Sequence, residues 1–311
     1  MHNGQGHQFK HGRNELFEMK TLADARTMFQ SAISDTNQIN PCASSTGLEG
    51  IEEEDIDVPE SYDWREAYPD CVQPVQSVGA NCSASYAFAT LSAVEDRICM
   101  NNNQTVKLST QEVVDCDPNS FGCDGGYVNK VLNWGRKKGF ILDECMEYKG
   151  TKNECEVDHL ESNICRVDSQ FYRIQDYCIS YQPENIMREI IKNGPVIGQI
   201  IPFTDFLAYK DGLYHRTEEA FKFNGQHIVK IVGWSKSMDG STEWIIENSW
   251  GADWGENGYA RIHGKGELGI ELYAIAPSII PYTAYDYYSM QQMVNASEEE
   301  GVFDTETIEL E

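Results

Sequence analysis

The hydrophobic pattern changes once along the chain, and this change limits the fold more than any other feature. Between residues 83 and 194, apolar residues recur at steps of three and four, which is typical of amphipathic helices. After residue 194 they form short runs bounded by glycine and proline, which is typical of strands. Helices followed by strands predict an α+β fold with two lobes.

The expected elements lie in a compact region that begins at Val58. We expect helices over residues 83–100, 108–116, 126–139 and 183–194, and strands over residues 195–202, 226–234, 243–250 and 258–264. Residues 1–57 are a separate polar segment, with helical spacing in 22–33 and an acidic run after it. Residues 281–311 are rich in tyrosine and then acidic, which indicates a C-terminal tail.

Charge excludes several classes of partner. The formal net charge is -26, whereas nucleic acids and anionic membranes attract clustered lysine and arginine. No apolar run is long enough to span a bilayer. Paired Cys-x-x-Cys clusters are absent, so we expect no metal, and no cofactor is indicated.

The ten cysteines indicate an oxidising compartment, and hence a secreted or endolysosomal protein. The first ten residues, MHNGQGHQFK, have no apolar core and are no signal peptide. Either a targeting segment is missing from this sequence, or the protein is cytosolic and its thiols are mostly free. The first alternative is favoured.

Five motifs then occur in a characteristic order: VPESYDWREAYPDC, GANCSASYAFA, VVDCDPNSFGCDGGY, GQHIVKIVGW and ENSWGADWGENGYARI. In this order and spacing the chain resembles the papain-like cysteine proteases, and cathepsin B in particular. The resemblance covers about residues 58–280, and residues 1–57 are similar to a short propeptide followed by an acidic linker. It implies a helical left lobe and a β-barrel-like right lobe with a cleft between them.

The resemblance also implies roles for individual residues. His227 aligns with the family's catalytic base, Asn248 with the residue that orients it, and Trp250 with the indole that shelters the pair. Gly125 and Gly126 either align with a cleft wall that holds extended peptides or merely close a tight turn. The implied disulfides are Cys71–Cys99, Cys82–Cys123, Cys116–Cys155 and, more loosely, Cys145–Cys165, and Cys42 and Cys178 have no assigned partner.

The nucleophile departs from the family pattern. The family's Cys-Gly-Ser-Cys-Trp-Ala-Phe is here Cys-Ser-Ala-Ser-Tyr-Ala-Phe, so Ser85 occupies the catalytic position. Placing Cys82 there instead would move it off the helix N-terminus and leave Cys123 unpaired. A hydroxyl does not form the thiolate–imidazolium pair on which a cysteine protease depends. The oxyanion glutamine is also missing, and Asn81 is a conceivable replacement.

Three hypotheses for the function are compatible with these sequence features. The leading hypothesis is a pseudo-peptidase that binds a polypeptide substrate or protein partner in its cleft, or serves as a subunit of a larger assembly. The second is a working peptidase that uses Ser85, His227 and Asn248. The third is a structural protein whose propeptide-like segment stays in the cleft permanently.

Overall fold

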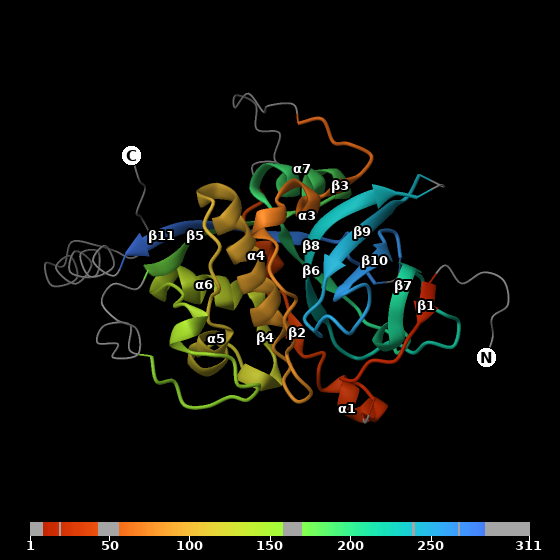
Figure 1. Ribbon diagram of the computed structural model, residues 1–311, viewed down its shortest axis with the longest axis horizontal. Helices are drawn as coiled ribbons and strands as arrows, with labels where there is room; N and C mark the ends of the chain where they lie inside the picture. Colours follow the sequence, from red (N-terminus) through yellow and green to blue (C-terminus); the bar gives the residue numbers. More distant parts are fainter. Residues whose placement is uncertain are drawn as a thin grey trace, which may run out of the picture.

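The computed structural model describes residues 9–18, 20–42, 56–157, 170–237, 240–266 and 268–283. Helices α4, α5 and α6 make up one lobe, and most of the strands make up the other (Figure 1). This is the predicted α+β arrangement of two lobes, and the prediction is confirmed. Among the described residues, no helix is sufficiently long and apolar to cross a membrane.

The described residues contain six α-helices, and the four after residue 83 lie close to their predicted positions. They are α1 (Leu22–Arg26), α3 (Trp64–Ala67), α4 (Ser85–Asn102), α5 (Thr110–Cys116), α6 (Val128–Lys138) and α7 (Pro183–Asn193). The Ser109 hydroxyl caps α5 by accepting the Glu112 N–H at 3.0 Å. Gly139 ends α6 and Gly194 ends α7, both at positive φ, where glycine is the favoured residue.

The second lobe is a nine-stranded sheet in the order β1-β7-β10-β9-β8-β6-β11-β5, with β3 paired to β8. Its strands are β1 (Phe9–His11), β3 (Tyr62–Asp63), β5 (Gln170–Ser180), β6 (Val196–Ile200), β7 (Tyr209–Tyr214), β8 (His227–Lys236), β9 (Thr242–Glu247), β10 (Tyr259–His263) and β11 (Ala274–Thr283). The strand order does not close into a barrel among the described residues, so the right lobe is an open sheet. The period-2 pattern did not reveal β5, which pairs along its length with β11.

Disulfides join distant parts of the chain. The three firmer implied pairs, Cys71–Cys99, Cys82–Cys123 and Cys116–Cys155, are all present, so these predictions are confirmed. Cys145 is disulfide-bonded, and its expected partner Cys165 lies outside the described residues. No described cysteine is free, which contradicts the alternative of mostly free thiols.

A fourth disulfide, Cys42–Cys178, was not predicted. It links the residues before position 43 to strand β5 of the sheet.

The N-terminal segment, defined here as residues 9–18 and 20–42, lies along the peptidase-like region rather than apart from it. It runs from β1 at the edge of the sheet, past α1, to the two-residue strand β2 (Ser31–Ala32) beside α4 (Figure 1). Strand β2 pairs in parallel with β4 (Gly126–Tyr127). Met28 and Phe29 are almost completely buried and belong to the same hydrophobic core as both lobes.

The helix expected over residues 22–33 is much shorter in the structure. It ends at Arg26, and the chain beyond it becomes extended. The Gln226 N–H donates to the Phe29 carbonyl oxygen at 3.1 Å, and Ser31 pairs with Gly126. These partners belong to the two lobes, so tertiary hydrogen bonds replace the helical ones that the local pattern favours.

Candidate functional site

Ser85, His227 and Asn248 come together from three elements. Ser85 is the first residue of α4, His227 is the first residue of β8, and Asn248 follows β9 directly. The Ser85 hydroxyl oxygen accepts the Ile228 N–H at 3.4 Å, which places it beside the start of β8. The helix N-terminus, the imidazole and the amide thus lie next to one another at the junction of the two lobes.

The imidazole of His227 is enclosed on several sides. Its Nε2 donates to the Asn248 side-chain oxygen at 2.7 Å, so Nδ1 carries the lone pair. The Trp250 ring lies 4.7 Å from the imidazole, and the Phe29 ring of the N-terminal segment lies 5.7 Å away in an edge-on arrangement. Nδ1 is buried and has no hydrogen-bond partner among the described residues, so it is not bonded to the Ser85 hydroxyl.

Burial controls the protonation of His227. The side chain is completely buried, and this lowers its pKa to about 4, while the hydrogen bond to Asn248 opposes the shift. The imidazole is therefore neutral at pH 5 to 7 and is a weak base as long as Phe29 covers it.

This burial predicts a pH-dependent stability. Between pH 6.5 and 4 the unfolded chain binds a proton at His227 that the folded chain does not bind, so stability falls as the pH falls. The contribution is complete above the unfolded pKa and lost near pH 4, and it amounts to roughly 3 kcal/mol. Urea unfolding at pH 7 and pH 4 should show this loss in the wild type relative to His227→Gln. Equal pH dependence in both proteins would contradict it.

The cleft between the lobes is filled by backbone of the N-terminal segment. Gly125, at φ 107°, lies so close to Gln30 that an added Cβ would overlap the Gln30 carbonyl oxygen. On the opposite side, a Cβ at Gly225 would overlap the Phe29 carbonyl oxygen. Gly125 and Gly126 thus lie directly against an extended chain, and here that chain is residues 29–32.

Two serines join the segment to the start of α4. The Gln30 N–H donates to the Ser83 hydroxyl at 3.1 Å, and the Ser31 hydroxyl donates to the Ser83 carbonyl oxygen at 3.0 Å. Ser83 stands where the resembling sequences have glycine. Its side chain adds a hydrogen bond to the segment, of a kind that contributes about 1 kcal/mol.

The oxyanion side of the site lacks a donor side chain at the expected position. The register with the family motif places Gly79 where the glutamine should stand, and Gly79 has φ 73° with open space around it. Asn81, the conceivable replacement, is exposed. Loss of one such donor typically lowers the rate about a hundred- to a thousandfold.

A buried ion-pair network holds the elements of the site together. Lys230 on β8 lies 2.5 Å from the Asp96 carboxylate on α4 and 2.9 Å from the Glu247 carboxylate at the end of β9. It also donates to the Ser92 hydroxyl at 2.7 Å. Burial alone would lower the pKa of Lys230, but the two carboxylates outweigh it and hold the pKa above its usual value. The network therefore connects α4, which carries Ser85, to the strands next to His227 and Asn248.

Sequence reasoning missed the residues that hold the segment. Phe29, Gln30 and Ser31 show no motif, because their role depends on which residues face them. The pair Cys42 and Cys178 could have been found, since these two cysteines remained after the implied pairs were assigned. Among the described residues, the grouping with metal-ligand spacing is this pair with Glu189, and its sulfurs are already bonded to each other.

A comparison with protein families agrees with this geometry. The model of the papain family cysteine proteases matches residues 58–278. The chain belongs to this family. Cathepsin B-like CP3 of Giardia intestinalis is 34% identical over 220 residues, which cover 68% of this chain and 72% of that protein. Cathepsin B-like CP2 of the same organism is 34% identical over 229 residues, covering 71% and 74%.

Solved structures of precursor forms are similar over most of the chain. Procathepsin B S9 from Trypanosoma congolense has a TM-score of 0.74 at 26% identity, covering 88% of this chain and 94% of that one. Procathepsin L2 from Tenebrio molitor larval midgut has a TM-score of 0.70 at 27% identity, covering 87% and 84%. The chain is thus a cathepsin B-like homologue of the papain family. Its four described disulfides and its cathepsin-like relatives are consistent with a secreted or lysosomal location.

Proposed function

We propose that this papain-family homologue has lost peptide hydrolysis, or nearly so, and acts by holding polypeptide in its cleft. The observation that carries the proposal is the serine at the start of α4, whose hydroxyl makes no hydrogen bond to the His227 Nδ1. A serine nucleophile needs its proton removed during attack by a base in close contact. While residues 29–32 fill the cleft, a buried imidazole with a pKa of about 4 is also poorly suited to that step.

The substitutions around the site favour binding over cleavage. Ser83 gives the segment a hydrogen-bond acceptor that glycine would lack. The Tyr86 hydroxyl, at the position of the family's tryptophan, donates to the Gly122 carbonyl oxygen at 3.2 Å and so supports the loop before the glycine wall. Two departures from the family motif thus stabilise the occupied cleft, while Ser85 and Gly79 remove catalytic groups.

The second candidate function is a peptidase that uses Ser85, and the retained pairing of His227 with Asn248 favours it. The imidazole is in the tautomer that leaves Nδ1 free to accept a proton. The two candidates differ in one respect, which is whether the Ser85 hydroxyl becomes nucleophilic once the cleft is open.

An open-cleft chain provides the test. It carries Cys42→Ser and Cys178→Ser, with a protease recognition sequence inserted between residues 43 and 56, and is cut and freed of its N-terminal segment. We expect no turnover of a peptide library and no labelling of Ser85 by a fluorescent phosphonate. A fluorescent peptide with the sequence of residues 26–36 should bind equally well to this chain and to its Ser85→Ala derivative.

A cooperative urea unfolding transition serves as the control for folding of the open chain. Hydrolysis of peptides by the open chain, together with phosphonate labelling that is absent in Ser85→Ala, would establish the second candidate instead. Failure of the folded open chain to bind any extended peptide would contradict the polypeptide-holding role.

A further inference from the structure

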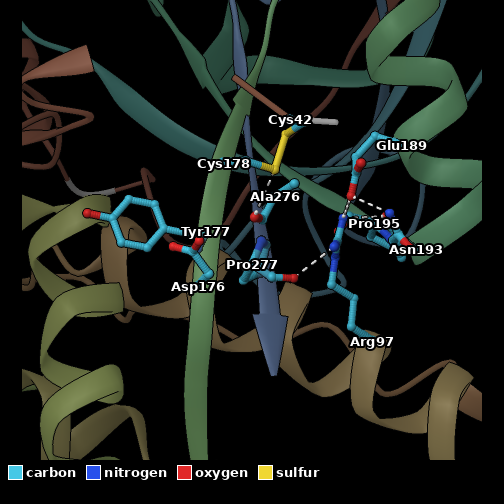
Figure 2. Close-up of a disulfide and its surroundings, with 11 residues drawn as sticks. Cys42, Arg97, Asp176, Tyr177, Cys178, Glu189, Asn193, Pro195, Ala276 and Pro277 are labelled. Atoms are coloured by element: carbon cyan, nitrogen blue, oxygen red, sulfur yellow. Dashed lines mark hydrogen bonds and ion pairs between the residues drawn. A yellow bond between two sulfur atoms is a disulfide. The ribbon is translucent and has the colours of Figure 1, made fainter. Parts of the chain in front are cut away.

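The Cys42–Cys178 disulfide ties the end of the N-terminal segment to the sheet. The two Cα atoms are 4.7 Å apart, and the bond spans 136 positions of the sequence. Beside it, the Cys42 N–H donates to the Ile179 carbonyl oxygen and the Ile179 N–H donates to the Asn40 carbonyl oxygen, each at 2.9 Å. Figure 2 shows the two sulfurs joined next to Ala276 of β11. The segment is thus covalently attached at the end where the chain continues toward residue 58.

This attachment changes what a cut in the chain can do. A cut between residues 43 and 57 breaks the backbone connection, but every residue up to Cys42 stays bonded through Cys178. A tethered ligand has an effective concentration in roughly the mM range. The separated segment would therefore return to the cleft faster than a polypeptide at low concentration could replace it.

We propose that the Cys42–Cys178 bond is a redox-sensitive lock, so that the cleft opens only after both a backbone cut and reduction of this disulfide. The proposal shares with the proposed function only the assignment of residues 29–32 as the occupant of the cleft. It holds whether or not Ser85 is catalytic.

The two cysteines of the disulfide differ in their exposure to solvent. Cys42 is 1% exposed, whereas Cys178 is partly exposed and lines a pocket of about 330 Å³. Arg97 and Lys192 line the same pocket. The Arg97 guanidinium donates to the Pro277 and Pro195 carbonyl oxygens, both at 2.8 Å, and these bonds fix one side of the pocket (Figure 2). A small dithiol can enter a pocket of this volume.

The exchange is balanced with a dithiol as the reductant. One thiolate of the dithiol attacks the Cys178 Sγ, the sulfur–sulfur bond to Cys42 breaks, and Cys42 leaves as a thiolate that takes a proton from water. The second thiol of the reductant then attacks the mixed disulfide and releases Cys178 as a thiol. Two electrons pass to the protein, both cysteines gain protons, and the reductant becomes a cyclic disulfide.

The experiment follows exchange of the segment rather than hydrolysis. A protease recognition sequence is inserted between residues 43 and 56 of the full chain, the N-terminus is labelled with a fluorophore, and the chain is cut. A large excess of unlabelled synthetic segment is added, and the label that remains with the protein is measured by size exclusion. We expect full retention in the cut chain, and complete loss in the cut Cys42→Ser/Cys178→Ser chain. Dithiothreitol should release the label from the cut wild type and not from the uncut chain.

Matched disulfide variants separate the lock from a general effect of reduction. Cys116→Ser/Cys155→Ser removes a bond within the helical lobe and should retain the label as the wild type does. Retention in the cut Cys42→Ser/Cys178→Ser chain would overturn the proposal, because the segment would then be held without the bond. Mass spectrometry of the non-reduced protein that found no Cys42–Cys178 peptide would overturn it as well. Neither result depends on hydrolysis, so failure of the lock is distinguishable from failure of the proposed function.

Discussion

Ser85→Cys is expected to create peptide hydrolysis in the open-cleft chain, whereas we expect none from the unsubstituted chain. A thiol at the first position of α4 can ionise beside His227, because the helix N-terminus and an imidazolium both stabilise a thiolate. Removal of Phe29 exposes one side of the imidazole to water and so raises its pKa toward the ordinary value. The measurements are the initial rate on a fluorogenic dipeptide and the rate of alkylation by iodoacetamide at pH 6.

The missing oxyanion donor sets the expected size of this gain. With Gly79 in place of the glutamine, the rate should remain about a hundred- to a thousandfold below that of a complete site. The matched control is Ser85→Cys combined with His227→Gln, which should alkylate slowly at pH 6 and show background hydrolysis. A thiol that alkylates equally slowly with His227 present would show that the imidazole does not reach it, and would contradict the retained geometry.

Lys230→Met is expected to destabilise the protein by about 3–5 kcal/mol, because it leaves Asp96 and Glu247 buried without their cation. The methionine fills a similar volume, so the loss reflects charge rather than a cavity. Urea unfolding at pH 7 measures it directly. The same network joins α4 to β8 and β9, so the substitution should also weaken binding of the fluorescent peptide to the open cleft.

A surface lysine on the same strand provides the comparison. Lys236 is exposed at the far end of β8, and Lys236→Met should change the unfolding free energy by less than about 0.5 kcal/mol. Similar effects of the two substitutions would show that the Lys230 network does not hold the lobes together.

Much of the fold follows from local pattern. The helices α4, α5, α6 and α7 and the strands β6, β8, β9 and β10 lie where periodicity predicts them, because each buries one face or one run of apolar residues. Glycine ends α6 and α7 for a local reason. The residue that follows each helix adopts a positive φ, which glycine tolerates better than other residues. The open right lobe is less barrel-like than the resemblance implied, because closure depends on strand order rather than on strand pattern.

The site was predictable only in part. His227, Asn248 and Trp250 could be identified because each lies in a motif whose spacing is specific, and the structure brings them together. The N-terminal segment was not predictable in its bound form. Its helical spacing is real, but Phe29 and Ser31 gain burial and hydrogen bonds from both lobes only when the chain is extended.

The sequence by itself determined which chemical groups are available: a serine at the head of α4, a histidine and an asparagine near strands, and ten cysteines. Only the tertiary structure decided that residues 29–32 lie between the glycines of the two lobes and that Cys42 bonds to Cys178. The physical reason is that burial of His227 and pairing of these cysteines depend on contacts across more than a hundred residues. Local sequence pattern carries no information on such contacts. Only the packing of the folded chain determines them.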